Sequence, residues 1–154
     1  MHSFRMSGTG KLVLISNREP YVHERTKKGI KCKVPPGGVV TAIDPVMQAI
    51  GGTWIAWGSG NADMEVSDAS GRIAVPPEDP RYTLRRIWLS TKEVADYYLG
   101  FSNRVLWPIC HMFQENAQFN KEYWEAYKRV NEKFAAAALS LIHISEPTRQ
   151  AEIS

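Results

Sequence analysis

Arg18 stands at a position where binding residues of α/β proteins are commonly found. The residue lies in the polar turn Ser16–Pro20, directly after the unbroken aliphatic run Leu12–Ile15. Such a run predicts a short strand that is buried on both faces, as in parallel sheets. Ligands of open α/β sheets bind beyond the carboxyl ends of the strands. Arg18 is therefore the first candidate for contact with a ligand.

Two glycines, Gly37 and Gly38, introduce the next element of regular structure. A stripe at helical spacing follows them, formed by Val40, Ile43, Met47 and Ile50. Glycine lets a backbone N–H approach an anion closely, and the amino end of a helix adds partial positive charge. The order of strand, polar turn, Gly-Gly and helix is typical of a phosphate or nucleotide site. The sequence has neither the GxGxxG pattern nor a P-loop, so a purely structural turn is the alternative.

The block YYLGFSNRVLWP, residues 97–108, holds four large aromatic side chains. Tyrosine and tryptophan offer flat apolar faces to the C–H surface of a sugar and polar edges to its hydroxyl groups. Aromatic residues near a helix end also pack into the core, and the block alone does not separate the two interpretations.

The elements that must position these residues alternate between strand and helix. Residues 11–57 predict one βαβ unit that ends in the strand Thr53–Trp57. Within its helix, Pro45 predicts a kink or a restart, with Asp44 as the N-cap. The polar stretch Tyr21–Val34 predicts a hairpin or a mobile loop. Further strands are predicted at Arg72–Val75 and Tyr82–Leu89.

Two more helices are predicted towards the end of the chain. Ser90 and Glu93 form a capping-box pattern for a helix to Leu99, with Gly100 as its stop. Asn120 caps a longer helix, in which Glu125 and Arg129 pair on the outside. An apolar stripe on that helix consists of Tyr123, Tyr127, Val130 and Phe134.

Composition excludes several classes of function. The chain has 154 residues, 44% of them hydrophobic, and a net charge of +3 without a basic stripe of the kind that nucleic-acid binding requires. Its two cysteines, Cys32 and Cys110, show no metal-ligand spacing, and no apolar run suits a membrane span. We expect a cytoplasmic protein with no metal, no cofactor, no nucleic-acid partner and no membrane contact.

Residues 139–154, LSLIHISEPTRQAEIS, differ in character from the helix before them. They resemble the peptide that results when sequencing-adapter DNA is translated. We therefore expect residues 1–138 to form the domain, and residues 139–154 to be a non-native tail that packs against nothing.

Five segments resemble, in order and spacing, the amino-terminal domain of glycosyltransferase family 20, the trehalose-6-phosphate synthases. They are LVLISNREP, PPGGVVTAIDPVM, GGTWIAWGSG, DYYLGFSNRVLWPICH and FNKEYWEAYKRVN. The resemblance implies an incomplete, Rossmann-like α/β domain of a GT-B glycosyltransferase. It also implies a retaining transfer of glucose from a nucleotide-glucose to glucose 6-phosphate, with an inactive fragment because the donor half of the site lies elsewhere.

The same resemblance implies roles for individual residues. Glucose 6-phosphate would contact Arg18, Trp57, Tyr98 and Trp107. The donor diphosphate would meet Gly38, beside Gly37, and no catalytic residue is identifiable. Tyr97, His23 and His111 are interpreted as structural. The donor nucleotide (UDP, GDP or ADP) and the oligomeric state stay open. Two alternative functions also stay open: a non-catalytic sugar-phosphate-binding domain, and a sister activity such as glucosylglycerol-phosphate synthase.

Overall fold

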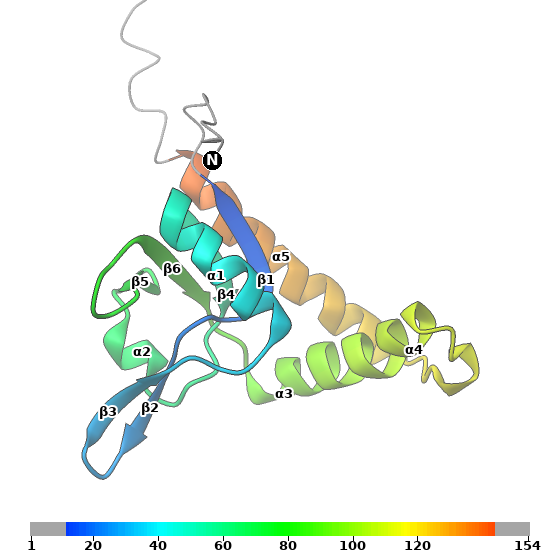
Figure 1. Cartoon of the computed structure of the whole chain (residues 1–154). Coiled ribbons are helices and arrows are strands. Elements are labelled where there is room, and N and C mark those ends of the chain that lie inside the picture. Colours follow the sequence, from blue (N-terminus) through cyan, green and yellow to red (C-terminus); the bar gives the residue numbers. More distant parts are fainter. Residues whose placement is uncertain (1–11, 144–154) are drawn as a thin grey trace, which may run out of the picture.

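A four-stranded sheet in the order β1–β4–β6–β5 forms the centre of the computed structural model, which describes residues 12–143 (Figure 1). Strands β1, β4 and β6 are parallel, and β5 runs antiparallel to β6. A separate antiparallel hairpin, β2–β3, lies in the connection between β1 and α1. The strands are β1 (Val13–Arg18), β2 (Val22–Thr26), β3 (Gly29–Lys33), β4 (Thr53–Trp57), β5 (Arg72–Val75) and β6 (Tyr82–Ile87).

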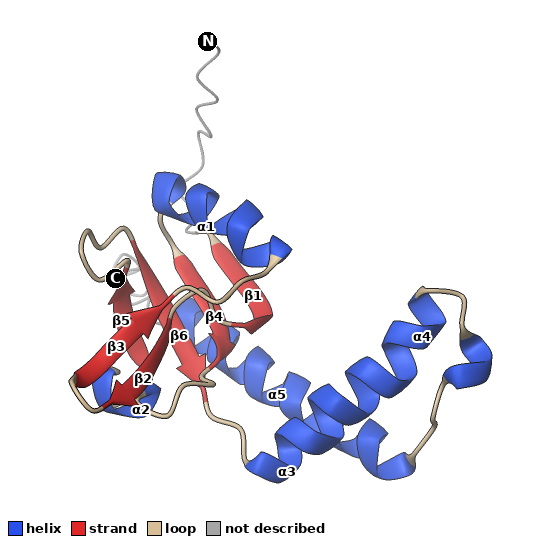
Figure 2. Cartoon of the chain, turned by 60° about the horizontal axis from the view of Figure 1, so that its bottom comes forward, coloured by secondary structure: helices blue, strands red, loops and turns tan. Residues whose placement is uncertain are grey.

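Helices cover both faces of the sheet (Figures 1 and 2). Helix α1 packs on one face, and α5 crosses the other. The helical elements are α1 (Gly38–Ile50), α2 (Asp63–Val66), α3 (Thr91–Glu93), the wide π-type helix η1 (Val94–Leu106), α4 (Trp107–Cys110), the 3-10 turn η2 (Gln114–Asn116) and α5 (Lys121–His143). We call residues 91–116, which project from the sheet alongside the first part of α5, the helical arm (Figure 2). None of the helices within residues 12–143 has the length and apolar character needed to span a bilayer.

Strand β4 is the buried centre of the sheet, and β1 is an edge. Trp54 and Ile55 of β4 have no exposed surface and point to opposite faces. In β1, by contrast, Val13 is 41% exposed and Ile15 47% exposed. The prediction that the first strand is buried on both faces was therefore wrong, because within residues 12–143 β1 pairs with a strand on one side only and α5 packs on β4 and β6.

Two apolar clusters hold the layers together. Under α1 lie Tyr21, Met47, Trp54, Ala56, Val75, Tyr82 and Leu84. Between the other face, α5 and η1 lie Ile55, Ile87, Tyr97, Ala126, Val130, Phe134 and Ala137. Alternation along β4 and β6 divides their side chains between the clusters, which is what the period of two in a strand dictates. The predicted α/β class, with its βαβ unit and parallel sheet, is confirmed.

Helix α1 runs without interruption through Pro45, so Asp44 does not act as an N-cap. The Asp44 carboxylate instead accepts hydrogen bonds from the hydroxyl groups of Tyr21 (3.1 Å) and Tyr82 (2.5 Å). It also accepts one from Gln48 Nε2, at 2.6 Å. The side chain therefore ties the helix to the sheet below it, a role that the local sequence pattern of an Asp-Pro pair does not reveal.

The helical arm begins as predicted but does not end at Gly100. Ser90 and Glu93 form a complete capping box, with the Ser90 hydroxyl accepting from the Glu93 amide at 3.2 Å. The helix then continues through Gly100 to Leu106. A Cβ atom on Gly100 would stand 2.7 Å from the ring of Tyr123 in α5. The glycine is therefore needed for the close approach of two helices, and the prediction of a helix stop was wrong.

Helix α5 starts as predicted, with the Asn120 side chain accepting from the Glu122 amide at 2.7 Å. Glu125 pairs with Lys128 at 2.9 Å rather than with Arg129 as expected. The helix runs past residue 138 to His143, and Leu141 packs against the cluster beneath α5. The expectation that residues 139–154 touch nothing was wrong for Leu141. Residues 144–154 lie outside the described part of the chain.

Candidate functional site

Arg18 ends β1, and its side chain is held by an aromatic residue of η1. Its Nε donates to the Tyr98 hydroxyl at 3.2 Å, and its guanidinium carbon lies 5.7 Å from the centre of the Tyr98 ring. The strand register shifts between Ile15 and Arg18. In this stretch the Ser16 hydroxyl donates to the Arg18 carbonyl and accepts from Trp54 Nε1. The register shift, held in place by the hydrogen bond from Trp54 to Ser16, therefore determines the position of the Arg18 backbone.

Trp57 ends the neighbouring strand β4 and completes the group. Its ring is tilted against Tyr98, with the ring centres 5.9 Å apart. These three residues from β1, β4 and η1 line one cavity of about 250 Å³. The remaining lining residues are Glu19, Val22, Pro35 and Ser59. A cation and two aromatic faces thus meet at the carboxyl ends of adjacent parallel strands, as expected for a ligand site in this kind of sheet.

A second cavity, also about 250 Å³, adjoins the first and reaches the amino end of α1. Arg18, Pro35 and Tyr98 border both cavities. The further lining residues are Ser16, Asn17, Pro36, Gly37, Gly38, Val39 and Val40. Apart from the adjoining backbone, no atom of the described residues would lie within 4 Å of a Cβ on Gly37 or Gly38, so the backbone there is open to a ligand. Unpaired amides and the helix dipole make this end of α1 favourable for an anion.

The two neighbouring tyrosines of the aromatic block separate as the sequence predicted. Tyr97 is 7% exposed and packs against Tyr127 of α5, with the ring centres 5.9 Å apart. Tyr98 faces the cavities. Adjacent positions of a helix point in different directions, so one ring enters the core and the other the site.

Trp107 is the one predicted site residue that the structure does not bring to Arg18. It lies in α4 on the helical arm, is 54% exposed and lines neither cavity. Its ring stacks on His111, with the ring centres 4.0 Å apart, and the His111 side chain contacts the Trp107 carbonyl. The expectation that Trp107 shares the pocket of Tyr98 is not met in this arrangement.

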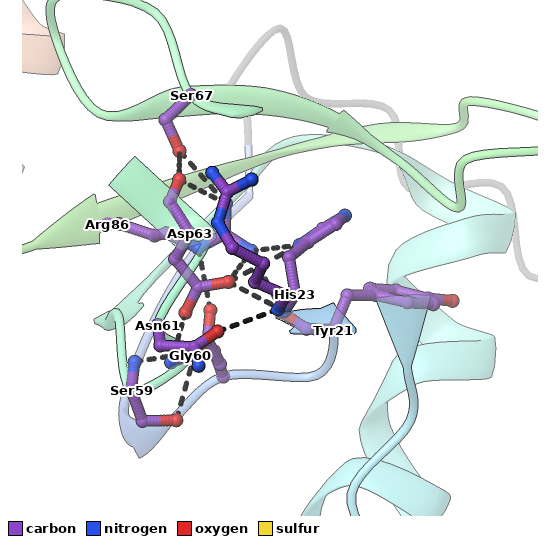
Figure 3. A network of polar contacts seen from close by, with 10 residues as sticks. Tyr21, His23, Ser59, Gly60, Asn61, Asp63, Ser67 and Arg86 are labelled. Atoms are coloured by element: carbon purple, nitrogen blue, oxygen red, sulfur yellow. Dashed lines mark hydrogen bonds and ion pairs between the residues drawn. The ribbon is translucent and has the colours of Figure 1, made fainter. Parts of the chain in front are cut away.

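Glu19 of the first cavity's lining belongs to a buried cluster of charged residues. Figure 3 shows its members Arg86, Asp63 and His23. Arg86 of β6 donates through Nε to Glu19 at 2.7 Å and lies 3.1 Å from Asp63. It also donates to the ring Nδ1 of His23 at 2.9 Å. All four side chains are at most 5% exposed. No partner of His23 could be identified from the sequence, because its partners come from segments 40 and 63 positions further along the chain.

Burial and neighbouring charges shift the pKa values in this cluster. Burial and the nearby Asp63 raise the pKa of Glu19 to about 7. Burial also opposes ionisation of Asp63, but hydrogen bonds from Glu19 and from the His23 amide outweigh it and lower the pKa of Asp63. Burial and the charge of Arg86 lower the pKa of His23, so its ring is neutral at neutral pH. The cluster is satisfied by its own members, and we interpret it as support for the site wall.

No other constellation of the described residues suggests a catalytic centre. Within residues 12–143, no three or more His, Cys, Asp or Glu side chains gather where they could hold a metal ion. The chemistry that this site offers is binding: a guanidinium and a helix amino end for anions, and aromatic faces for an apolar or sugar surface.

Comparison with known proteins finds similarity to one family along most of the chain. The model described as glycosyltransferase family 20 matches residues 10–146. A trehalose-6-phosphate synthase of Mycolicibacterium smegmatis is 37% identical over 133 residues, which are 86% of this chain and 25% of that protein. The chain thus spans about a quarter of the length of the curated relatives that it matches.

Solved structures give the same result. An Escherichia coli structure bound with UDP-2-fluoro glucose aligns with a TM-score of 0.60 at 30% identity, over 86% of this chain and 25% of that one. An alpha,alpha-trehalose-phosphate synthase from Burkholderia xenovorans, in complex with glucose-6-phosphate, aligns with a TM-score of 0.59 at 26% identity. That alignment covers 86% of this chain and 26% of the other.

Proposed function

Because the chain belongs to glycosyltransferase family 20, we propose that it is the acceptor-side part of a retaining glucosyltransferase that makes trehalose 6-phosphate. The substrates would be a nucleotide-glucose and glucose 6-phosphate. The observation that carries the proposal is the meeting of Arg18, Trp57 and Tyr98 in one cavity that adjoins the amino end of α1. Relatives solved with a UDP-glucose analogue and with glucose-6-phosphate support the same pair of ligands.

The first cavity takes glucose 6-phosphate in this proposal. Arg18 pairs with the phosphate, because a guanidinium offers parallel N–H donors that match phosphate oxygens. Trp57 and Tyr98 contact the sugar ring through their faces. Tyr98 has a second task, since its hydroxyl accepts from Arg18 Nε and so turns the guanidinium towards the cavity.

The second cavity takes the diphosphate of the donor. Its anionic oxygens would meet the amides at the start of α1, where Gly37 and Gly38 leave the backbone uncovered. Arg18 and Tyr98 border both cavities, so the two ligands would lie side by side. Catalysis of this kind depends on holding two substrates in line and on stabilising the charge of the leaving diphosphate.

A titration followed by amide and arginine-side-chain NMR signals tests the proposal. Glucose 6-phosphate should shift the Arg18 Nε signal and the amide signals of Ser59 and Trp57, which line the first cavity, in a saturable way. Glucose should bind about tenfold or more weakly, because it lacks the charge-assisted contact to Arg18. Equal affinities for the two sugars, or shifts confined to other parts of the chain, would contradict the proposed acceptor site.

A further inference from the structure

The first cavity has an unusual balance of hydrogen-bond donors and acceptors. Arg18 supplies only donors. The Tyr98 oxygen already accepts from Arg18, so its hydroxyl hydrogen is free to donate. Both carboxyl oxygens of Glu19 already have partners, Arg86 for one and Ser59 for the other, and the group also contacts Asp63. A bound sugar needs acceptors as well as donors, because each of its hydroxyl groups carries a hydrogen.

Ser59 is the remaining polar residue of the lining, and its hydroxyl hydrogen is already committed. The backbone amide of Ser59 donates to Glu19 Oε1 at 2.8 Å, and its hydroxyl donates to the same oxygen at 3.1 Å. Within residues 12–143 no group donates to Ser59 Oγ. With its hydrogen directed at Glu19, the hydroxyl oxygen keeps its lone pairs for a ligand.

The buried cluster fixes this orientation from behind (Figure 3). Arg86 holds the second oxygen of Glu19 at 2.7 Å and is itself anchored by the Tyr21 carbonyl at 2.9 Å. On the other side of Ser59, the Gly60 amide donates to the Asp63 carboxylate. A Cβ on Gly60 would stand 2.3 Å from the His23 carbonyl, so no side chain fits at this position and the backbone packs closely against β2. Ser59 is therefore held between two buried carboxylates.

We propose that Ser59 is a specificity-determining residue whose Oγ accepts a hydrogen bond from one ring hydroxyl of the bound sugar phosphate. Glu19 and Arg86 are positioning residues that keep the serine hydrogen pointed away from the ligand. The inference rests on the proposed function, since it assumes a phosphorylated sugar in this cavity. A neutral acceptor suits the place, because a free carboxylate beside Arg18 would repel the phosphate that Arg18 binds.

The test compares Ser59→Ala with the wild-type chain against glucose 6-phosphate and its 2-deoxy, 3-deoxy and 4-deoxy analogues. Affinities come from NMR titrations at pH 8, where the Glu19 carboxylate is ionised. Ser67→Ala is the matched control: Ser67 belongs to the same buried network, in which its hydroxyl oxygen accepts from Arg86 at 2.9 Å, but it lies outside the lining of the cavity. The change of residue type is identical, and only the place in the network differs.

Ser59→Ala should bind glucose 6-phosphate about three- to tenfold more weakly, while Ser67→Ala should bind it as the wild type does. With the wild-type chain, one deoxy analogue should bind about three- to tenfold more weakly than glucose 6-phosphate. The same analogue should bind the wild type and Ser59→Ala with equal affinity. This equality identifies the hydroxyl, and general loosening of the wall would not produce it.

Equal affinities of the wild-type chain for glucose 6-phosphate and every deoxy analogue would contradict the Ser59 proposal, even if Ser59→Ala fails to fold. Unchanged affinity of a folded Ser59→Ala would contradict it as well. In both cases the proposed function would stand. If the wild-type chain binds none of the sugar phosphates, the proposed function and the Ser59 proposal fall together.

Discussion

Two aromatic residues of the same helical segment differ in their surroundings. Tyr98 contacts Arg18 and Trp57, whereas Trp107 stacks on His111 and is more than half exposed. Aromatic side chains contribute to binding where they are in contact with the ligand. The two residues therefore give opposite expectations, although the family resemblance assigns both to one pocket.

Tyr98→Ala should weaken binding of glucose 6-phosphate about tenfold or more, because it removes a ring face and the hydroxyl that orients Arg18. Trp107→Ala should change the affinity by less than about twofold, within the usual scatter of surface substitutions. Calorimetric titration of both variants measures the difference. A loss with Trp107→Ala as large as that with Tyr98→Ala would place Trp107 in the pocket after all.

The Glu19 carboxyl should titrate near neutral pH. An unfolded chain loses this proton near pH 4.5, whereas the folded chain keeps it to about pH 7. The raised pKa of Glu19 therefore stabilises the folded chain by about 3 kcal/mol below pH 4.5. This stabilisation is lost as the pH rises to about 7. The lowered pKa values of Asp63 and His23 act in the opposite direction.

Because these contributions overlap, the titration is best observed at the Glu19 carboxyl carbon itself by NMR. A midpoint near pH 7 is expected. A midpoint near the ordinary value of 4.5 would mean that the ion pair with Arg86 outweighs burial.

Individual residues were predictable where their surroundings are local. Arg18 follows its strand directly, whereas the different surroundings of Tyr97 and Tyr98 were implied only by the family resemblance. Glu19 and Ser59 were missed as parts of the site, because their hydrogen bond joins residues 40 positions apart. The buried cluster is held together by contacts of this long-range kind, which no local pattern contains.

At the scale of elements, the ends of helices were harder to predict than their starts. Ser90 and Asn120 act as caps through bonds to residues two or three positions away. Gly100 carries the same local signal as a helix stop, but its function depends on Tyr123 of another helix. Tertiary packing outweighs the local tendency of glycine to end a helix.

Gly100→Ala should lower the free energy of unfolding by about 1–3 kcal/mol, because the added methyl overlaps the Tyr123 ring. Gly38→Ala is the matched control, since no atom lies within 4 Å of its Cβ position, and its stability should be unchanged or slightly higher. Chemical denaturation of both variants gives the values. A Gly100→Ala variant as stable as the wild type would mean that the two helices separate without cost.

At the scale of the whole molecule, the class of fold was predictable and its limits were not. Alternating strand and helix patterns predict a parallel sheet regardless of detail. The order of the strands in the sheet decides which strand lies at an edge. The apolar run Leu12–Ile15 does not contain this information. The boundary predicted at residue 138 likewise does not coincide with the end of a helix.

Leu141→Ala should lower the free energy of unfolding by about 1 kcal/mol, because this half-buried side chain packs against the cluster beneath α5. Leu139→Ala, in the same helix at a side chain that is 55% exposed, should have no measurable effect. Thermal unfolding of both variants compares them. Equal melting temperatures for Leu141→Ala and the wild type would restore the interpretation of a tail that packs against nothing.

The central claim is that Arg18 binds the phosphate of a sugar phosphate. Its most direct test is the affinity of the chain for glucose 6-phosphate after Arg18→Ala, with Arg81→Ala as the control. Arg81 is an exposed arginine that pairs with Asp79 next to the start of β6. Arg18→Ala should weaken binding about tenfold or more and leave glucose binding unchanged, while Arg81→Ala should change neither affinity. An unchanged affinity for glucose 6-phosphate in Arg18→Ala would contradict the account.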